Sequence, residues 1–379
     1  MAMIFFIPEE IENFRSRIRK FCETSLEKNA QRWDQNEEFP MESLKALAEE
    51  GILSIGIPEE YGGTDPSKLK EIIATEEIAR VDPNTAIQME IKSLYENTVL
   101  LFGSEEQKST LKEIVKAKKI PAFAFTEPSG GTDITGIKSI AKKEKDKYLI
   151  SGSKNFISNA LVADYFVLFA KTAENFKEKG FSAFLVRKGI ENFKPGKKLH
   201  QTGIRGSAIS SLHYENSPVD EKDMIGREGQ GVKIFLTVLE RSRLVLSAGS
   251  LGSLQRIYEE SVKFSNNRTS AGLPIINYQF IQYYLSEMLK DIEASRLLLY
   301  NAAMLLERGM PMGLESTVAK LYTTEALVKN ANNAVQLMGG YGYTQGTVIE
   351  RLARDAHAAT FGLGSSEAMR ILLTRYMKK

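Results

Sequence analysis

The chain has 379 residues, 42% of them hydrophobic, and 50 basic residues nearly balance 48 acidic ones for a net charge of +2. This length predicts two or three packed units rather than one small core, and the charge balance argues against nucleic acid as a partner. Cys22 is the only cysteine and the three histidines are scattered, so the sequence predicts no internal disulfide and no metal site.

The first residues, Met1–Ile7, are apolar but short, and they lack the basic stretch that opens a signal peptide. The sequence holds no run of about 18 apolar residues, which a membrane-spanning helix needs. We therefore expect no membrane span, and the simplest location is the cytoplasm.

Apolar residues recur at helical spacing from about residue 8 to residue 118. Pro40 and Gly51 frame one such segment as residues that begin and end helices. A turn-rich connection covers residues 58–63. The predicted helices are 9–27, 41–50, 70–80, 85–102 and 105–118.

Short β-rich runs follow, separated by segments rich in Gly and Asn, and they predict a small barrel or sandwich. The clearest runs are 122–125, 148–151, 165–169 and 181–186. After Gly231 the predicted helices return and are longer. An apolar stripe at helical spacing marks one of them, and its members are Ile281, Tyr284, Leu285, Met288, Leu289 and Ile292.

This order predicts an α+β protein with three domains. They are an N-terminal helical domain (1–118), a middle β-barrel or sandwich domain (119–225) and a C-terminal helical bundle (226–379). We expect the last domain to pack against the first as an antiparallel bundle.

Two segments of the β region carry groups suited to ligand binding. Residues 123–133 run from a strand into a Gly-rich turn with hydroxyls at Thr126, Ser129 and Thr132. In residues 152–160, Phe156 precedes Ser158 on the same strand face, where an aromatic ring covers a planar ligand and a hydroxyl bonds its edge. Taken singly, each segment is also explained as a strand end or as a core aromatic beside an exposed serine.

Together these segments resemble two signatures of the acyl-CoA dehydrogenase family. Thr126-Glu127-Pro128 matches the first, and Phe156-Ile157-Ser158-Asn159 resembles the tryptophan-isoleucine-threonine-asparagine of the second. The resemblance spans nearly the whole chain. Further matching segments are 61–63, 102–108, 203–207, 225–231, Arg268 with Gln279, 336–342 and 354–367.

The resemblance implies a helical domain, a β domain and a C-terminal four-helix domain, assembled as a homotetramer with FAD in each subunit. It implies that Thr126 and Ser158 contact the isoalloxazine ring and that Phe156 packs against it. It places Thr132 at the pantetheine arm and Arg243 at the substrate. Other residues implied at the FAD site are Arg268, Gln279, Gln336 and Gly340, reaching from a neighbouring subunit, with Ser365 and Glu367.

Arg268 also has a physical rationale, since a guanidinium forks onto phosphate oxygens. Two positions depart from the family pattern. Ala271 stands where a phenylalanine is usual, and Glu367 stands where a glutamine is usual. The contacts to the adenosine end of FAD are therefore expected to differ.

The family's catalytic glutamate often precedes the glycine that matches Gly364, but that position is Leu363 here. Some relatives place the glutamate before the arginine that matches Arg243, and that position is Ser242. Removal of a proton from the α-carbon needs a base within reach, which leucine cannot supply. The backbone N–H of Leu363 still matches the donor that holds the thioester oxygen.

Glu90 is the candidate replacement base, because it lies in an apolar helical segment that lines the acyl pocket in the family. Burial there raises the pKa of a carboxyl, which suits a base. The alternative is that Glu90 is an exposed helix carboxylate beside Lys92. Glu240 is expected to point to another helix face than Ser242.

The sequence therefore predicts an FAD-dependent oxidoreductase acting on an acyl thioester of CoA or of an acyl carrier protein, at a CH–CH bond or on an α-hydroxyacyl group. Electron transfer flavoprotein and oxygen are the candidate electron acceptors. Two alternatives remain open at this point: a flavin-dependent monooxygenase of the same fold, and a non-catalytic subunit that retains the fold.

Overall fold

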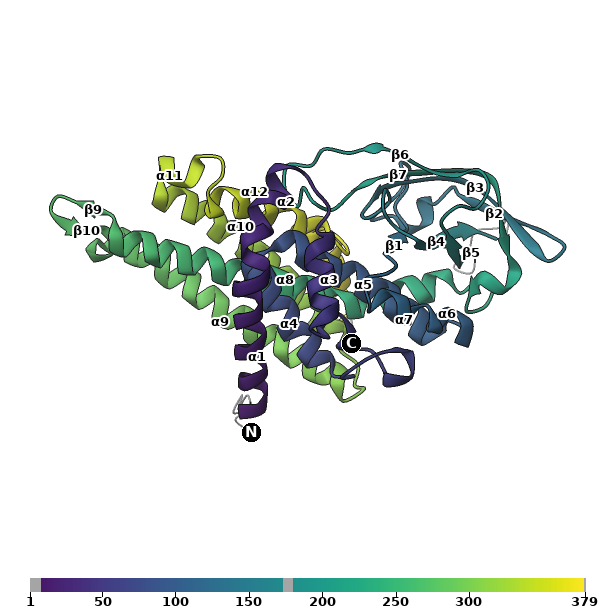
Figure 1. Ribbon diagram of the computed structural model, residues 1–379, viewed down its shortest axis with the longest axis horizontal. Helices are drawn as coiled ribbons and strands as arrows, with labels where there is room; N and C mark the ends of the chain where they lie inside the picture. Colours follow the sequence, from purple (N-terminus) through teal and green to yellow (C-terminus); the bar gives the residue numbers. More distant parts are fainter. Residues whose placement is uncertain (1–7, 173–179, 378–379) are drawn as a thin grey trace.

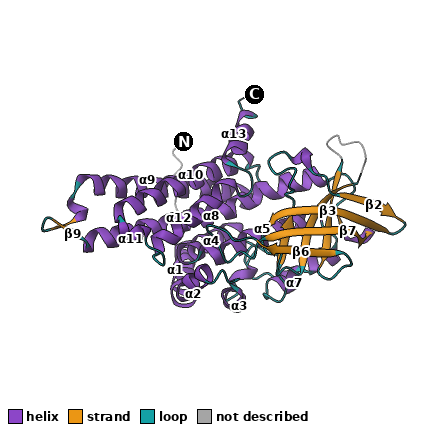
Figure 2. Ribbon diagram, turned by 90° about the horizontal axis from the view of Figure 1, so that it is seen from above, coloured by secondary structure: helices purple, strands orange, loops and turns teal. Residues whose placement is uncertain are grey.

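The computed structural model describes residues 8–172 and 180–377 (Figure 1). The apolar start Met1–Ile7, which was not expected to be a signal peptide, lies outside these residues. The sheet occupies one end of the molecule, and long helices extend to the other (Figure 2). Among the described helices, none is long and apolar enough to cross a membrane.

The first domain is helical, as predicted, with two long central helices, α4 and α5. A capping aspartate, Asp82, accepts from the N–H of Asn84 and starts α5 one residue after α4 ends. The elements are α1 (Glu9–Phe21), a π-helical turn (Cys22–Leu26), α2 (Glu27–Gln35), α3 (Met41–Glu49), α4 (Lys68–Val81), α5 (Pro83–Phe102), α6 (Glu105–Ser109) and α7 (Leu111–Ile114).

Two predicted helices are interrupted. The π-helical turn divides the predicted helix 9–27. The predicted helix 105–118 divides at Thr110, whose Oγ1 donates to the carbonyl of Gln107 at 2.5 Å, and its last turn ends at Ala117 in the left-handed region (φ 50°). Side-chain bonds of this kind compete with the helix's own hydrogen bonds, and helical spacing alone does not reveal them.

The middle domain is one eight-stranded sheet in the order β6-β7-β3-β2-β4-β5-β8, with β1 added parallel to β4. It contains the four predicted strands. The strands are β1 (Pro121–Ala124), β2 (Ile140–Glu144), β3 (Lys147–Ile157), β4 (Tyr165–Lys171), β5 (Phe181–Arg187), β6 (Phe193–Lys198), β7 (Ser210–Asp220) and β8 (Met224–Ile225).

The third domain is the predicted helical bundle, built on α8, α9, α10 and α12. Leu285, Met288 and Ile292 of the predicted stripe are buried in its core, whereas Leu289 is exposed. The elements are α8 (Gly231–Asn267), the hairpin β9 (Thr269–Ser270) and β10 (Leu273–Pro274), α9 (Gln279–Glu307), α10 (Gly313–Met338), α11 (Gly340–Tyr343), α12 (Val348–Phe361) and α13 (Ser366–Thr374).

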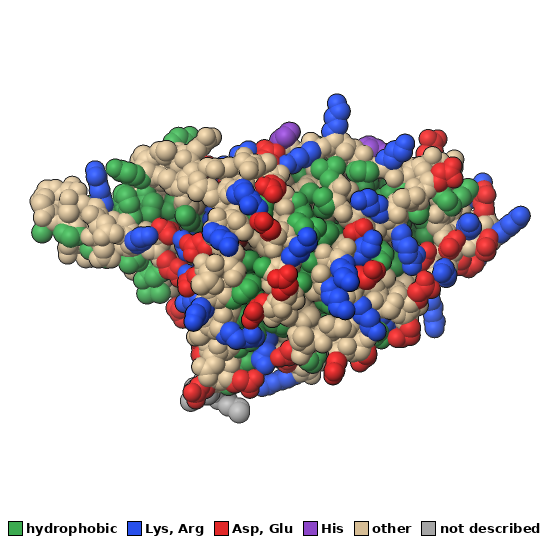
Figure 3. Space-filling model, in the orientation of Figure 1, with side chains coloured by type: hydrophobic (Ala, Val, Ile, Leu, Met, Phe, Trp, Pro, Cys, Tyr) green, Lys and Arg blue, Asp and Glu red, His purple; other side chains and the backbone are tan. Residues whose placement is uncertain are grey.

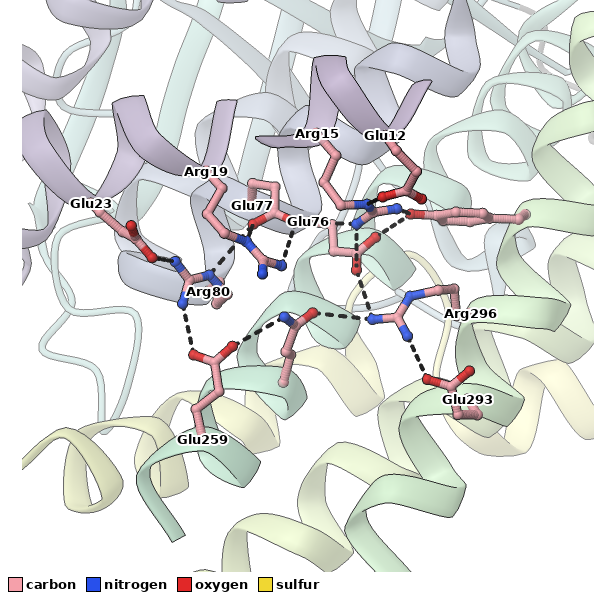
Figure 4. Close-up of polar contacts among 12 residues, drawn as sticks. Glu12, Arg15, Arg19, Glu23, Glu76, Glu77, Arg80, Glu259, Glu293 and Arg296 are labelled. Atoms are coloured by element: carbon pink, nitrogen blue, oxygen red, sulfur yellow. Dashed lines mark hydrogen bonds and ion pairs between the residues drawn. The ribbon is translucent and has the colours of Figure 1, made fainter. Parts of the chain in front are cut away.

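The first and third domains share one core and one buried ion network. Ile72 and Ile73 of α4 pack with the apolar residues of α8 and α9. Figure 4 shows arginines and glutamates from α1, α4, α8 and α9 pointing toward one another between the two domains. Elsewhere, acidic and basic side chains are interspersed over the face seen in Figure 3. Ion pairs of this network thus join α1 to α4, and α4 to α8 and α9.

Candidate active site

A cavity of about 1300 Å³ lies where the sheet meets the helices of the first and third domains. One face of α5 and the apolar side of α8 form its helical walls. The turn after β1 and the end of β3 form the sheet-side wall. The loop between α12 and α13 closes it. All of the predicted catalytic, substrate and flavin-ring residues line this cavity, together with Ser365 of the predicted FAD site; they are Glu90, Leu363, Thr132, Arg243, Thr126, Phe156 and Ser158.

A buried ion pair holds the sheet-side wall in place. Lys154 on β3 donates to Glu127 Oε1 at 2.7 Å and to the carbonyl of Phe125 at 3.1 Å. Glu127 in turn accepts from the backbone N–H groups of Lys138 and Ser139 at 2.6 and 3.1 Å. These contacts fix the turn that carries Thr126 against the strand that leads to Ser158.

The end of β3 is shaped to present an aromatic ring. The pairing of β3 with β7 shifts between Lys154 and Ile157, and Phe156 has a φ of 56°. A bulge of this kind re-aims a side chain, and 63% of the surface of Phe156 is exposed. The hydroxyls of Thr126 and Ser158 bond no other described residue. An open ring flanked by two free hydroxyls is a surface suited to a planar polar heterocycle.

Glu90 lies on the cavity face of α5, among the apolar residues Ala86, Ile87, Ile91 and Leu94. It is partly buried. Burial raises the pKa of Glu90 to about 7, and the positive charge of Lys320 acts in the opposite direction. A carboxyl with this pKa is part ionised at neutral pH, as a general base requires.

Lys92 does not neutralise Glu90. It points to another face of α5, where its Nζ donates to Glu71 at 2.6 Å and pairs with Glu96 at 2.7 Å. Glu90 is therefore not paired with the lysine beside it in the sequence.

Two cations hold the last turn of α12 and the loop before α13 by their backbone carbonyls. Nζ of Lys320, on α10, donates to the carbonyls of Thr360 and Gly364 at 2.9 and 2.7 Å. Nε of Arg243, on α8, donates to the carbonyl of Leu363 at 3.2 Å. Leu363 itself has a φ of 51°, a conformation that costs a non-glycine residue energy and persists only where neighbours impose it.

A second cavity of about 840 Å³ lies at the far end of the bundle, between the β9–β10 hairpin and α11. Arg268, Gln336 and Gly340, which were predicted to lie together at an FAD site, all line it. Gln279 lies exposed between Tyr278 and Phe280, which also line it. The guanidinium of Arg268 packs over the Tyr341 ring and has no ion-pair partner among the described residues.

Three residues considered for the site lie apart from the first cavity. Glu367 is exposed on α13 and lines neither cavity described above. Ser242 is fully buried, with its Oγ 3.2 Å from that of Ser93. The carboxyl of Glu240 lies near Gly313 at the start of α10, and Glu240 does not line the first cavity.

Sequence reasoning missed Lys320 and Asp355. Lys320 interrupts a run of buried small residues in α10, and this isolated charge was the signal available. Asp355 follows Arg354 in α12 and lines the first cavity. Its Oδ1 accepts from the N–H of Ile204 at 2.6 Å, and burial raises the pKa of Asp355 to about 7 against that bond.

Known proteins resemble this chain along its whole length. Residues 8–117, 122–217 and 229–378 match the models of the N-terminal, middle and C-terminal domains of acyl-CoA dehydrogenases. An acyl-CoA dehydrogenase of Bacillus subtilis (strain 168) is 34% identical over 373 residues, 98% of each chain.

Two solved structures share the fold closely. The butyryl-CoA dehydrogenase of Megasphaera elsdenii superposes with a TM-score of 0.95 at 31% identity, over 100% of both chains. The prolyl acyl carrier protein oxidase AnaB has a TM-score of 0.95 at 29% identity, covering 98% of this chain and 100% of that one.

Proposed function

Because this chain belongs to the acyl-CoA dehydrogenase family, we propose that it oxidises an acyl thioester with Glu90 in place of the usual catalytic glutamate. The protein is an FAD-dependent oxidoreductase of this family. The thioester is carried by CoA or by an acyl carrier protein. The observation that carries the proposal is a carboxyl with a pKa near 7 in the wall of the cavity that also holds Leu363.

The first cavity fits the flavin ring of FAD and the acyl group together. Phe156 offers an exposed ring, and Thr126 and Ser158 offer hydroxyls that bond no other described residue. Bound FAD supplies the acceptor for the hydride that leaves the substrate's β-carbon. Thr132 and Ser365 line the same cavity, as their predicted contacts with the pantetheine arm and with FAD require.

Within this cavity Glu90 takes the proton from the α-carbon. Lys320 acts on both Glu90 and the loop at Leu363. Its Nζ donates to the carbonyl of Gly364, and its positive charge lowers the pKa of Glu90. The N–H of Leu363 donates to the thioester oxygen and stabilises the negative charge that develops there. Ser242 is buried against Ser93, which argues against the second family position as the source of the base.

The test of this proposal is anaerobic bleaching of the oxidised flavoprotein by acyl thioesters. Bleaching by an acyl-CoA or by an acyl carrier protein conjugate supports a dehydrogenase and identifies the carrier. Oxygen uptake by the reduced enzyme then separates oxygen from an electron transfer flavoprotein as the acceptor. Oxygenation of the product would instead identify a monooxygenase, and a colourless protein that no flavin restores would identify a non-catalytic subunit.

We expect Leu363→Glu to create or raise desaturation of a saturated acyl-CoA such as butyryl-CoA, because it puts a carboxylate where the family resemblance places one. The gain should be modest, since a base ~1 Å out of position costs ~100-fold. Stopped-flow reduction of the flavin measures it. Leu363→Gln is the matched control, having the same shape and no base. An equal gain in both variants would refute the role assigned to the carboxylate.

The second cavity fits the diphosphate and adenosine end of FAD from a neighbouring subunit. Arg268 supplies a guanidinium there that has no ion-pair partner within residues 8–172 and 180–377. Apolar surface surrounds the cavity, with Phe280 and Tyr343 each 82% exposed. Exposed aromatics on this scale mark an interface, and we propose that the protein assembles as a homotetramer, which light scattering tests. A monomer that retains its full flavin content would contradict it.

Arg268→Ala is expected to weaken FAD binding by about 10- to 150-fold, the equivalent of a charged hydrogen bond worth about 1.5–3 kcal/mol. Flavin retained after gel filtration, and reconstitution of the apoprotein with FAD, measure the loss. Arg308→Ala is the control, because Arg308 is also exposed but lies at the other end of α9. Unchanged affinity in Arg268→Ala would place the FAD phosphates elsewhere.

A further inference from the structure

Arg243 is a buried cation whose set of partners is incomplete. The residue is only 6% exposed and lines the first cavity. Its Nε bonds the carbonyl of Leu363, but no described residue accepts a bond from its two terminal nitrogens. Across residues 8–172 and 180–377, no carboxylate oxygen lies within 4.0 Å of this guanidinium.

The free end of this guanidinium lies beside the loop that closes the cavity. A Cβ built on Gly364 would stand 3.9 Å from Nη2 of Arg243, and both residues line the cavity. Burial lowers the pKa of Arg243 to about 10, although electrostatic interaction with Glu240 and Tyr376 acts to raise it. A buried charge in this state is costly unless a ligand pairs with it.

The cavity's own carboxyls do not supply the missing negative charge. Burial raises the pKa values of Glu90 and Asp355 to about 7, so each is part neutral at neutral pH. Arg354, another cation of the wall, is already paired with Asp34 at 2.6 Å. The apolar side chain of Leu363 adds no charge. Arg375 also lines the cavity but is exposed to solvent, whereas the guanidinium of Arg243 is buried and is paired with no carboxylate of the described residues.

We propose that Arg243 binds a carboxylate on the substrate's acyl group, so that the substrate is a short dicarboxylic acid held as a monothioester. This inference rests on the proposed function. A guanidinium pairs with a carboxylate through two parallel N–H bonds, and Arg243 has two terminal nitrogens for them. The acid is short because Arg243 bonds residue 363, whose N–H is assigned to the thioester oxygen.

The test uses the oxidised holoenzyme under anaerobic conditions, with two matched pairs of probes. Glutaryl-CoA is compared with 5-methylhexanoyl-CoA, and succinyl-CoA with 4-methylpentanoyl-CoA. In each pair an isopropyl group replaces the carboxylate at similar shape. Perturbation of the flavin spectrum gives the dissociation constant of each probe. We expect the anionic member of at least one pair to bind at least ~10-fold more tightly, as pairing with a buried charge predicts.

Arg243→Gln is expected to reduce that preference by ~10-fold or more, to near unity, because the partner charge is lost while only a neutral amide NH₂ donor remains. The ratio within each pair cancels any general disturbance of the loop. Arg243→Lys should keep part of the preference, since it keeps the charge and loses the fork. Leu363→Glu should abolish the preference by placing a carboxylate of the protein beside Arg243.

A preference for the anionic member below ~10-fold in both pairs overturns the proposal, as does an unchanged ratio in Arg243→Gln. In either case reduction of the flavin by neutral acyl-CoA probes leaves the proposed function standing. If no acyl thioester, on CoA or on a carrier protein, perturbs or bleaches the flavin, the proposed function fails and this inference falls with it.

Discussion

Glu90→Gln is expected to slow reduction of the bound flavin by the substrate by about 10²–10⁴-fold, the usual contribution of a general base. Glutamine keeps the shape and hydrogen bonding of the side chain and removes only its basicity. FAD content should be unchanged, because Glu90 lies on α5, away from Phe156 and Ser158 on the sheet side. Single-turnover stopped-flow absorbance under anaerobic conditions measures the rate of flavin reduction separately from the FAD content.

The pH dependence of the same rate gives an independent check. A base must be ionised, and burial places the pKa of Glu90 at about 7. The rate of reduction should therefore rise as pH increases through 7 and level off above it. Glu293→Gln is the control, because Glu293 is exposed on α9 and lines neither cavity, so its loss should change neither rate nor profile. A Glu90→Gln enzyme with normal rates would mean that the proton leaves by another group or that the reaction removes no α-proton.

The second large effect is expected in the ion network between the first and third domains (Figure 4). Glu77 on α4 is fully buried and pairs with three arginines. Its oxygens lie 3.1 Å from Arg15, 2.8 Å from Arg19 and 3.4 Å from Arg80. Glu77→Gln should lower the free energy of unfolding by about 3–5 kcal/mol, because removing one member leaves buried charges without compensation.

Denaturation followed by tryptophan fluorescence measures this loss. Trp33, the chain's one tryptophan, is buried in α2 of the first domain and reports on that domain directly. Glu293→Gln is the control in the same network, since Glu293 pairs with Arg296 at 2.8 Å but its side chain is 61% exposed. Exposed pairs contribute about 0.2–1 kcal/mol. Equal losses in the two variants would show that burial does not set the value of these contacts.

Much of this fold could be predicted from local sequence pattern. The order of helices, strands and helices follows from apolar periodicity, and the buried stripe of α9 contains Leu285, Met288 and Ile292 as expected. The breaks at residues 22–26 and at Thr110 could not be predicted, because Thr24 and Thr110 donate side-chain bonds to backbone carbonyls there and periodicity does not reveal such bonds. Leu289 is exposed on α9 although its spacing fits the stripe, because the apolar stripe is wider than the buried face.

The site divides in the same way. Signature residues such as Thr126, Phe156 and Ser158 could be assigned to one place because their short motifs are distinctive. The role of Lys320 could not be predicted, because the two carbonyls that it contacts lie 40 and 44 residues away along the chain. The state of Glu90 also required the structure, since only the packing of α5 shows that Lys92 turns to Glu71 and Glu96 instead.

The loop at Leu363 is anchored by its carbonyl oxygens, and carbonyl oxygens are the same in every amino acid. Lys320 and Arg243 would hold this stretch of backbone whatever side chain it carried. A substitution at residue 363 therefore changes the side chain that faces the cavity, which can be exchanged while the backbone of the loop keeps its contacts with Lys320 and Arg243.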